Sequence, residues 1–215
     1  MLDELREIVC RYNKLLPKHG LVTMTSGNVS GRDSESGLVV VKPSGVDFEV
    51  LAPGDMCVIG LDGKLVEGKL KPSVDTATHL YVYRNMPGVG SVIHTHSNFA
   101  TAFAALGRPI PCCLTAIADE FGGPIPVSDY APVGGDEIGR EIVEKIGDRP
   151  AILMKNHGVF TVGRTVQDAF KAAVMVEDVA KTVYLATCMG EPLDLPAEEI
   201  ARAHRRYLEK YGQRD

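Results

Sequence analysis

Two histidines, His94 and His96, stand one residue apart at the end of the apolar run in GSVIHTHSN. In a strand, residues i and i+2 point to the same face, so both imidazoles could converge on one ion while Thr95 turns away. A His-x-His pair by itself also suits an incidental structural role. The metal-site hypothesis therefore needs further ligands.

His157 and Asp75 are the candidates that would complete such a set. His157 follows the buried-strand pattern AILM in MKNHGVF, and the adjacent Gly158 lets the backbone turn closely around a site. Asp75 opens a predicted helix just before the His94 strand. Three imidazoles and a carboxylate fit zinc or another divalent transition metal, with positions open to a bidentate oxygen substrate if the carboxylate moves aside. The other histidines are expected to face solvent or to cap helices: His19, His79 and His204.

Three short stretches could hold a phosphate group. TSGNVSGR contains Asn28 between small donors and glycines, and KPSG contains Ser44 and Gly45, so the backbone can approach an anion closely. Ser73 lies at a predicted helix N-terminus, where free N–H groups favour an anion. Each stretch alone is also typical of an ordinary turn. Three of them beside a metal set indicate a phosphorylated substrate.

The elements that must position these residues follow a mixed helix and strand pattern. Strand patterns cover 38–41, 91–94, 110–115 and 151–154, and 57–68 is typical of a hairpin that turns at Asp62 and Gly63. Helical spacing covers 2–16, 75–86, 98–106, 136–146, 165–189 and 196–212, with Ser73 placed to cap the second helix. The hairpin-like strand neighbours disfavour a purely parallel sheet. No linker or repeat divides the chain, so we expect one α/β domain over residues 1–215.

The composition limits the classes of function. With 45% hydrophobic and 24% charged residues, the 215-residue chain is typical of a soluble globular protein. Its formal net charge of -5 provides no general attraction for nucleic acids or anionic membranes. A charged N-terminus and the lack of a run of about 18 apolar residues predict a cytoplasmic protein without a membrane span. The five scattered cysteines form no C-x-x-C pair and are expected to be reduced.

The motifs TSGNVSGR, VKPSGV, KPSVDTATH, VIHTHSN, IADEFGG, KNHG and KYGQ occur in this order along the chain. Together they resemble the class II aldolase and L-ribulose-5-phosphate 4-epimerase superfamily, and the resemblance covers essentially the whole chain. The segment from VKPSGV to HTHS is particularly close to the epimerase branch. The resemblance implies a mostly antiparallel central β-sheet packed between helical layers. It further implies a homotetramer with active sites at subunit interfaces.

The resemblance also implies roles for the residues at matching positions. A zinc-like ion, with Mn²⁺ or Co²⁺ as alternatives, would be bound by His94, His96 and His157, beside the acidic Asp75. The phosphate would be bound at four positions: Asn28, Ser44, Gly45 and Ser73. Val74 departs from the family, which commonly has a second serine there. One hydroxyl group to the phosphate would therefore be missing.

Two reactions remain open, and both break the bond between carbons 3 and 4 of a ketose phosphate. An aldolase releases the aldehyde fragment, whereas an epimerase turns the fragment and adds it back with carbon 4 inverted. Asp119 and Tyr211 match an epimerase acid and base pair, with Tyr211 acting from a neighbouring subunit, whereas Tyr130 resembles the aldolase proton donor. We expect an L-ribulose 5-phosphate 4-epimerase that forms D-xylulose 5-phosphate. The alternatives are a class II aldolase on a ketose 1-phosphate such as L-fuculose 1-phosphate, and a non-catalytic module like the adducin head.

Overall fold

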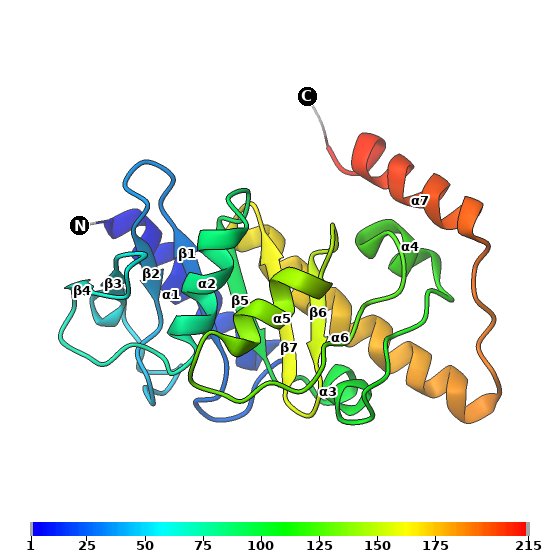
Figure 1. Cartoon of the computed structure of the whole chain (residues 1–215), viewed down its shortest axis with the longest axis horizontal. Coiled ribbons are helices and arrows are strands. Elements are labelled where there is room, and N and C mark those ends of the chain that lie inside the picture. Colours follow the sequence, from blue (N-terminus) through cyan, green and yellow to red (C-terminus); the bar gives the residue numbers. More distant parts are fainter. Residues whose placement is uncertain (1, 214–215) are drawn as a thin grey trace.

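A seven-stranded antiparallel sheet forms the centre of the part of the chain that the structure describes, residues 2–213 of a computed structural model (Figure 1). Its strand order is β4-β3-β2-β1-β5-β7-β6, and every neighbouring pair is antiparallel. The strands are β1 (Asn28–Arg32), β2 (Val39–Val41), β3 (Cys57–Ile59), β4 (Leu65–Glu67), β5 (Ser91–Thr95), β6 (Ala151–Met154) and β7 (Gly158–Gly163).

Helices cover both faces of this sheet, as predicted. The side chains of α2 (Thr76–Asn85) and α5 (Glu137–Lys145) pack on one face. On the other face lie α1 (Asp3–Lys18), α3 (Asn98–Ala105) and α6 (Val166–Met189). Figure 1 shows α4 (Thr115–Phe121) and α7 (Ala197–Lys210) together beyond the β6 edge, and a short 3-10 turn, Pro53–Asp55, precedes β3. The predicted helix-covered, mostly antiparallel sheet is confirmed.

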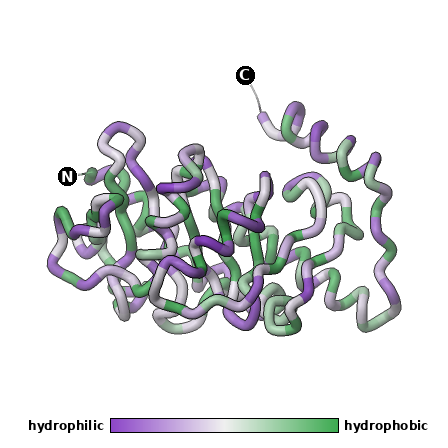
Figure 2. Tube along the Cα trace, in the orientation of Figure 1, coloured by the Kyte–Doolittle hydropathy of each residue, from purple (hydrophilic) through white to green (hydrophobic). Residues whose placement is uncertain are grey.

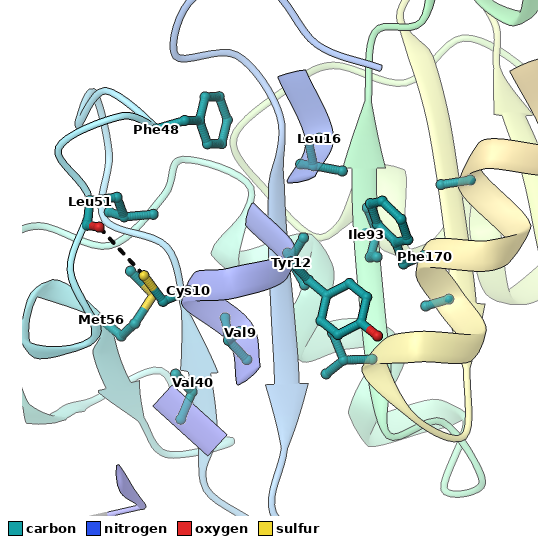
Figure 3. Close-up of a cluster of buried hydrophobic side chains, with 14 of the residues drawn as sticks. Val9, Cys10, Tyr12, Leu16, Val40, Phe48, Leu51, Met56, Ile93 and Phe170 are labelled. Atoms are coloured by element: carbon teal, nitrogen blue, oxygen red, sulfur yellow. Dashed lines mark hydrogen bonds between the residues drawn. The ribbon is translucent and has the colours of Figure 1, made fainter. Parts of the chain in front are cut away.

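The apolar pattern of the first helix explains how one layer is fixed. Val9, Tyr12 and Leu16 follow helical spacing and bury their side chains against the sheet, where they meet Val40 and Ile93 (Figure 3). Figure 2 shows that hydrophobic residues concentrate along the central strands, while the connecting loops are mostly hydrophilic. Burial of such a helix stripe is the main stabilising contribution at this interface.

Two expectations about local structure are wrong. Residues 110–115 do not form a strand, because Pro111 lacks the N–H that a ladder requires, and only Ile110 makes an isolated bridge, to Ile125. Thr115 instead begins α4, a helix that the sequence patterns did not predict. Ser73 does not cap α2, since that helix begins at Thr76 with Asp75 at the N-cap position and no side-chain cap. The patterns also missed β1 and β7.

Among residues 2–213, no helix combines the length and the apolar character that a bilayer crossing needs.

Candidate active site

Three histidines converge at one end of the central strands. His94 lies on β5, His96 follows the end of that strand, and His157 lies in the turn that joins β6 to β7. The ring centroid of His94 is 4.5 Å from that of His96 and 4.7 Å from that of His157. One ligand atom from each of the three lies within 4.8 Å of the others. This spacing suits a single metal ion.

The turn that carries His157 depends on its two neighbours. Asn156 adopts a left-handed backbone conformation, φ 59°, which asparagine tolerates better than most residues. At Gly158, an added Cβ would lie 2.5 Å from the carbonyl oxygen of Thr95 and 3.2 Å from the His94 ring. Only glycine therefore lets β7 approach β5 closely enough to bring His157 beside His94. In the sequence Asn-His-Gly, Asn156 thus forms the turn, His157 is the candidate ligand, and Gly158 allows β7 to approach β5 closely.

The hydrogen bonds and burial of the histidines favour metal binding. The Nδ1 atom of His94 lies 3.0 Å from the carbonyl oxygen of Val159, which can only accept, so Nδ1 carries the proton and Nε2 keeps a free lone pair. Burial lowers the pKa of His94 to about 3 and also lowers the pKa of His96 and of His157. Buried Nδ1 of His157 has no hydrogen-bond partner among residues 2–213. Neutral imidazoles with unused nitrogens fit a divalent transition-metal ion.

Asp75 lies beside this group, at the N-cap of α2. Its Oδ2 atom accepts a hydrogen bond of 2.7 Å from Nδ2 of Asn28, and its side chain is buried. Burial acts to raise the pKa of Asp75, but His94, His79 and the hydrogen bond from Asn28 act against it, and the net pKa lies below its ordinary value. An ionised carboxylate therefore stands next to three neutral imidazoles. It is not one of the mutually close ligand atoms of the histidine group.

The expectation that His79 faces solvent or caps a helix is wrong. Its side chain is fully buried, and its Nδ1 atom lies 2.7 Å from Oγ of Ser30. The reason is that residues 28–32, expected to be a phosphate loop, form strand β1 under α2. His19, by contrast, is the exposed C-cap residue of α1, and Nδ1 of His204 donates to the carbonyl oxygen of Asp119 in the last turn of α4.

The four expected phosphate positions surround the same cavity as the histidines. Two backbone hydrogen bonds join the loop that contains Ser44 to the loop that contains Ser73. The Ser44 N–H donates to the Lys71 carbonyl oxygen at 2.9 Å, and the Ser73 N–H donates to the Lys42 carbonyl oxygen at 3.0 Å. Val74 also lines this cavity, so an apolar residue stands among the expected phosphate-binding positions. The cavity measures about 300 Å³, and its expected site residues are Asn28, Ser44, Gly45, Ser73, Asp75, His94, His96 and His157.

Lys42 is a site residue that the sequence patterns did not single out. Its side chain lines the cavity although the residue is only 2% exposed. Its Nζ atom reaches the carbonyl oxygens of Thr25 and Pro43 only at 3.4 Å and lies 4.6 Å from the Phe48 ring. Burial lowers the pKa of Lys42, while Asp47 acts in the opposite direction. A buried ammonium group with such long hydrogen bonds is a suitable partner for a bound anion.

Three expected catalytic residues lie outside this cavity in their own chain. Asp119, on α4, accepts two hydrogen bonds of 3.1 Å from Arg206 on α7. Tyr211 follows α7, is 64% exposed and stacks on Tyr207. Tyr130 is 66% exposed in the loop before α5. The structure therefore brings the metal and phosphate candidates together, but not these three residues.

A larger cavity of about 410 Å³ lies between the end of α1 and residues 47–49. Its lining includes Lys14, Met24 and Phe48 but none of the six histidines. Chemistry rather than volume therefore identifies the smaller cavity as the candidate active site.

Glu177 on α6 holds the segment that follows His96. The N-cap residue of α3, Ser97, makes no side-chain capping bond. Instead the two carboxylate oxygens of Glu177 accept hydrogen bonds from the backbone N–H groups of Phe99, at 3.0 Å, and Ala100, at 2.9 Å. A carboxylate at this position satisfies free donors and interacts favourably with the helix dipole. It anchors the first turn of α3 to α6.

Replacing Glu177 by Gln should loosen this anchor, because one oxygen becomes an NH₂ group that opposes a backbone donor. We expect the free energy of unfolding to fall by about 1–2 kcal/mol, and the affinity for an added divalent metal ion to fall as His96 becomes less fixed. Denaturant unfolding and competition with a chelator measure both quantities. Asp178→Asn, the same chemical change at the neighbouring exposed position, is the control. Equal stability of the two variants would contradict the anchoring role.

Comparisons with known proteins agree with this arrangement. The family model described as Class II Aldolase and Adducin N-terminal domain matches residues 7–184. L-ribulose-5-phosphate 4-epimerase UlaF from Salmonella paratyphi B is 40% identical over 222 residues, covering 98% of this chain and 96% of that protein. Among solved structures, an L-fuculose 1-phosphate aldolase superposes with a TM-score of 0.91 at 32% identity, covering 95% of this chain and 96% of that chain. YgbL from Escherichia coli gives a TM-score of 0.79 at 27% identity, covering 94% and 98%.

Proposed function

The chain belongs to the class II aldolase and adducin N-terminal domain family, and from that premise we propose that it is an L-ribulose 5-phosphate 4-epimerase. The observation that carries the proposal is the convergence of three neutral histidines, an ionised Asp75 and the buried Lys42 on one cavity. A metal-binding end and an anion-binding end suit a phosphorylated sugar. UlaF, which is 40% identical over 98% of this chain, is an L-ribulose-5-phosphate 4-epimerase.

The proposed metal is Zn²⁺, held by His94, His96 and His157, because neutral imidazoles are the ligands that zinc commonly takes at catalytic sites. Mn²⁺ and Co²⁺ are the alternatives that metal analysis would distinguish. When bound, such an ion supplies a Lewis acid that stabilises negative charge on substrate oxygens. Asp75, whose carboxylate stands beside the three histidines, would add a negative charge next to such an ion and would give way to substrate oxygens.

The proposed role of the other end of the cavity is to hold the phosphate. Lys42 supplies the positive charge, and Asn28, Ser44, Gly45 and Ser73 supply hydrogen-bond donors around it. Fixing the phosphate directs carbons 3 and 4 of the sugar toward the histidines, which lowers the entropic cost of the reaction. The side chain of Val74 contributes no hydrogen bond, so Lys42 carries a larger share of phosphate binding.

The proposed reaction moves one proton off the carbon 4 hydroxyl and later returns one. As the base takes this proton, the electron pair of the bond between carbons 3 and 4 passes to the ketose fragment, which becomes an enediolate, and carbon 4 becomes an aldehyde. Addition to the opposite aldehyde face reforms the bond with inverted configuration. Inversion requires one acid–base group on each face of the aldehyde, and we assign these roles to Asp119 and Tyr211.

In the proposed mechanism, a second copy of the chain brings these two residues to the cavity. Asp119, Tyr130 and Tyr211 do not line the cavity of their own chain, and both tyrosines are mostly exposed. We therefore propose a homotetramer of single-domain chains, residues 1–215, with active sites at subunit interfaces. Sedimentation analysis would check the assembly.

The alternative function is a class II aldolase that cleaves a ketose 1-phosphate. The close structural similarity to an L-fuculose 1-phosphate aldolase and the presence of Tyr130 in the loop before α5 favour it. In that case Tyr130 would donate a proton to the released aldehyde.

Product analysis should separate the two reactions. We expect the Zn²⁺-loaded protein to convert L-ribulose 5-phosphate to D-xylulose 5-phosphate, and NMR would monitor this conversion. A chelator should abolish it. Release of dihydroxyacetone phosphate from L-fuculose 1-phosphate, without any epimerisation, would establish the aldolase instead.

Lys42→Met should raise the KM for the sugar phosphate by about tenfold or more, because the phosphate loses its hydrogen bond to the charged ammonium group of Lys42. The kcat should change much less, since Lys42 lies at the phosphate end. Steady-state kinetics and inhibition by inorganic phosphate check both expectations. Lys14→Met is the matched control, because Nζ of Lys14 donates to the Leu51 carbonyl oxygen and faces the other cavity. Similar KM values in both variants would remove Lys42 from phosphate binding.

Asp119→Asn should retain bound Zn²⁺ but lower the epimerisation rate by about 100-fold or more, since an amide cannot exchange the proton. Metal content and the rate of D-xylulose 5-phosphate formation are the two measurements. Unchanged epimerase kinetics would exclude Asp119 from the mechanism. Activity regained in mixed assemblies of Asp75→Asn and Asp119→Asn chains would show that the two residues act from different subunits.

A further inference from the structure

His79 is a buried histidine outside the metal set, and one of its nitrogens is unused. The residue lies on α2 with 0% exposure. Its Nε2 atom has no hydrogen-bond partner among residues 2–213. Buried polar nitrogens almost always have a hydrogen-bond partner, so we expect a group that can pair with Nε2 of His79.

The neighbouring hydrogen bonds fix which nitrogen carries the proton. The hydroxyl of Tyr83 accepts from the Val92 N–H at 3.1 Å, so its own proton points to Oγ of Ser30 at 2.7 Å. Ser30 then donates either to Nδ1 of His79, at 2.7 Å, or to the carbonyl oxygen of Val92, at 3.4 Å. The shorter contact decides for His79. Nδ1 is therefore an acceptor, and Nε2 carries the hydrogen.

The ring remains neutral under ordinary conditions. Burial lowers the pKa of His79 to about 4, although Asp75 acts to raise it. A neutral imidazole carries one ring hydrogen, which the preceding contacts assign to Nε2. His79 is thus a fixed donor rather than a residue that gains and loses a proton at neutral pH.

Asp75 is the acceptor best placed for this donor. The two residues are one turn apart on α2, with the His79 backbone N–H donating to the Asp75 carbonyl oxygen at 3.1 Å, so their side chains lie on the same helix face. Asp75 reaches Asn28 on β1, while His79 reaches Ser30, two residues further along the same face of that strand. The Asp75 carboxylate accepts from Asn28, and it is near enough to His79 to act on the pKa of that residue.

We propose that His79 is a positioning residue whose Nε2–H receives the Asp75 carboxylate when substrate oxygens displace it from the metal. This inference rests on the proposed function, in which substrate chelates the ion held by the three histidines. The carboxylate then has two hydrogen-bonded positions, one at Asn28 and one at His79, and it stays ionised in both. Displacement therefore leaves no unpaired buried charge, which would otherwise weaken substrate binding.

Two substitutions of His79 separate the donor from the rest of the ring. The amide of Asn reaches the position of Nδ1, whereas the amide of Gln reaches that of Nε2, so His79→Gln keeps a donor toward Asp75 and His79→Asn does not. The probe is acetohydroxamate, a bidentate oxygen chelator, titrated into the Co²⁺-loaded proteins by visible absorption. We expect the Kd for acetohydroxamate to be about tenfold weaker in His79→Asn and nearly unchanged in His79→Gln. Affinity for Co²⁺ itself should be similar in both.

The control is His19→Asn, which removes an exposed histidine at the end of α1 and should leave acetohydroxamate binding unchanged. A merely structural role would weaken acetohydroxamate binding in both His79 variants in step with their thermal stability, and that result would overturn the proposal. Because acetohydroxamate binding needs no turnover, the donor effect in a protein inactive on every sugar phosphate would support His79 and reject the proposed function. An active epimerase with equal acetohydroxamate affinities would reject the role of His79 alone.

The tautomer can be read directly from ¹⁵N NMR of the histidine side chains in the full-length protein. We expect the resonances of His79, assigned by their loss in His79→Gln, to show a protonated Nε2 and an unprotonated Nδ1. A protonated Nδ1 would overturn the proposal.

Discussion

The register of three central strands is the constraint on which the candidate site depends. Asn28 on β1 lies opposite His94 on β5, and His94 lies opposite Phe160 on β7, so one row of side chains crosses the sheet on the α2 face. The Phe160 ring stacks on His94 at 4.2 Å. A shift of β5 by one residue would send His94 to the opposite face and bring Ile93 or Thr95 into this row. The close approach at Gly158 and the length of the β6–β7 turn both maintain the register.

Desolvation gives this row its chemical character. The same burial that keeps His94 neutral also makes the ionised Asp75 and the ammonium group of Lys42 expensive in free energy. Asp75 is stabilised by the short hydrogen bond from Asn28, whereas the hydrogen bonds of Lys42 to carbonyl oxygens are long. A cation at the histidines and an anion at Lys42 would offset these costs. The cavity is therefore arranged for a ligand that is chelated at one end and negatively charged at the other.

The sequence predicted the parts of the site that depend on local periodicity. Alternation in VIHTH placed His94 and His96 on one face, and the apolar spacing of α1 and α6 located the helices that cover the opposite face. It did not predict that Asn28 to Arg32 form a strand, because β1 is held between β2 and β5, and its partner β5 lies far along the chain. For the same reason the sequence did not predict that His79 and Lys42 are buried. Burial imposed by distant segments has no local pattern.

The amide of Asn28 links the two ends of the cavity. Its Nδ2 atom donates to Oδ2 of Asp75 at 2.7 Å and to Oγ of Ser73 at 3.0 Å. Since Asp75 can only accept, the amide must present its NH₂ group on this side, which leaves no second orientation. In the proposed function, a phosphate at Ser73 and Asn28 competes for the donors that hold the Asp75 carboxylate in its present position. One shared side chain thus connects the phosphate end of the cavity to the position of the Asp75 carboxylate.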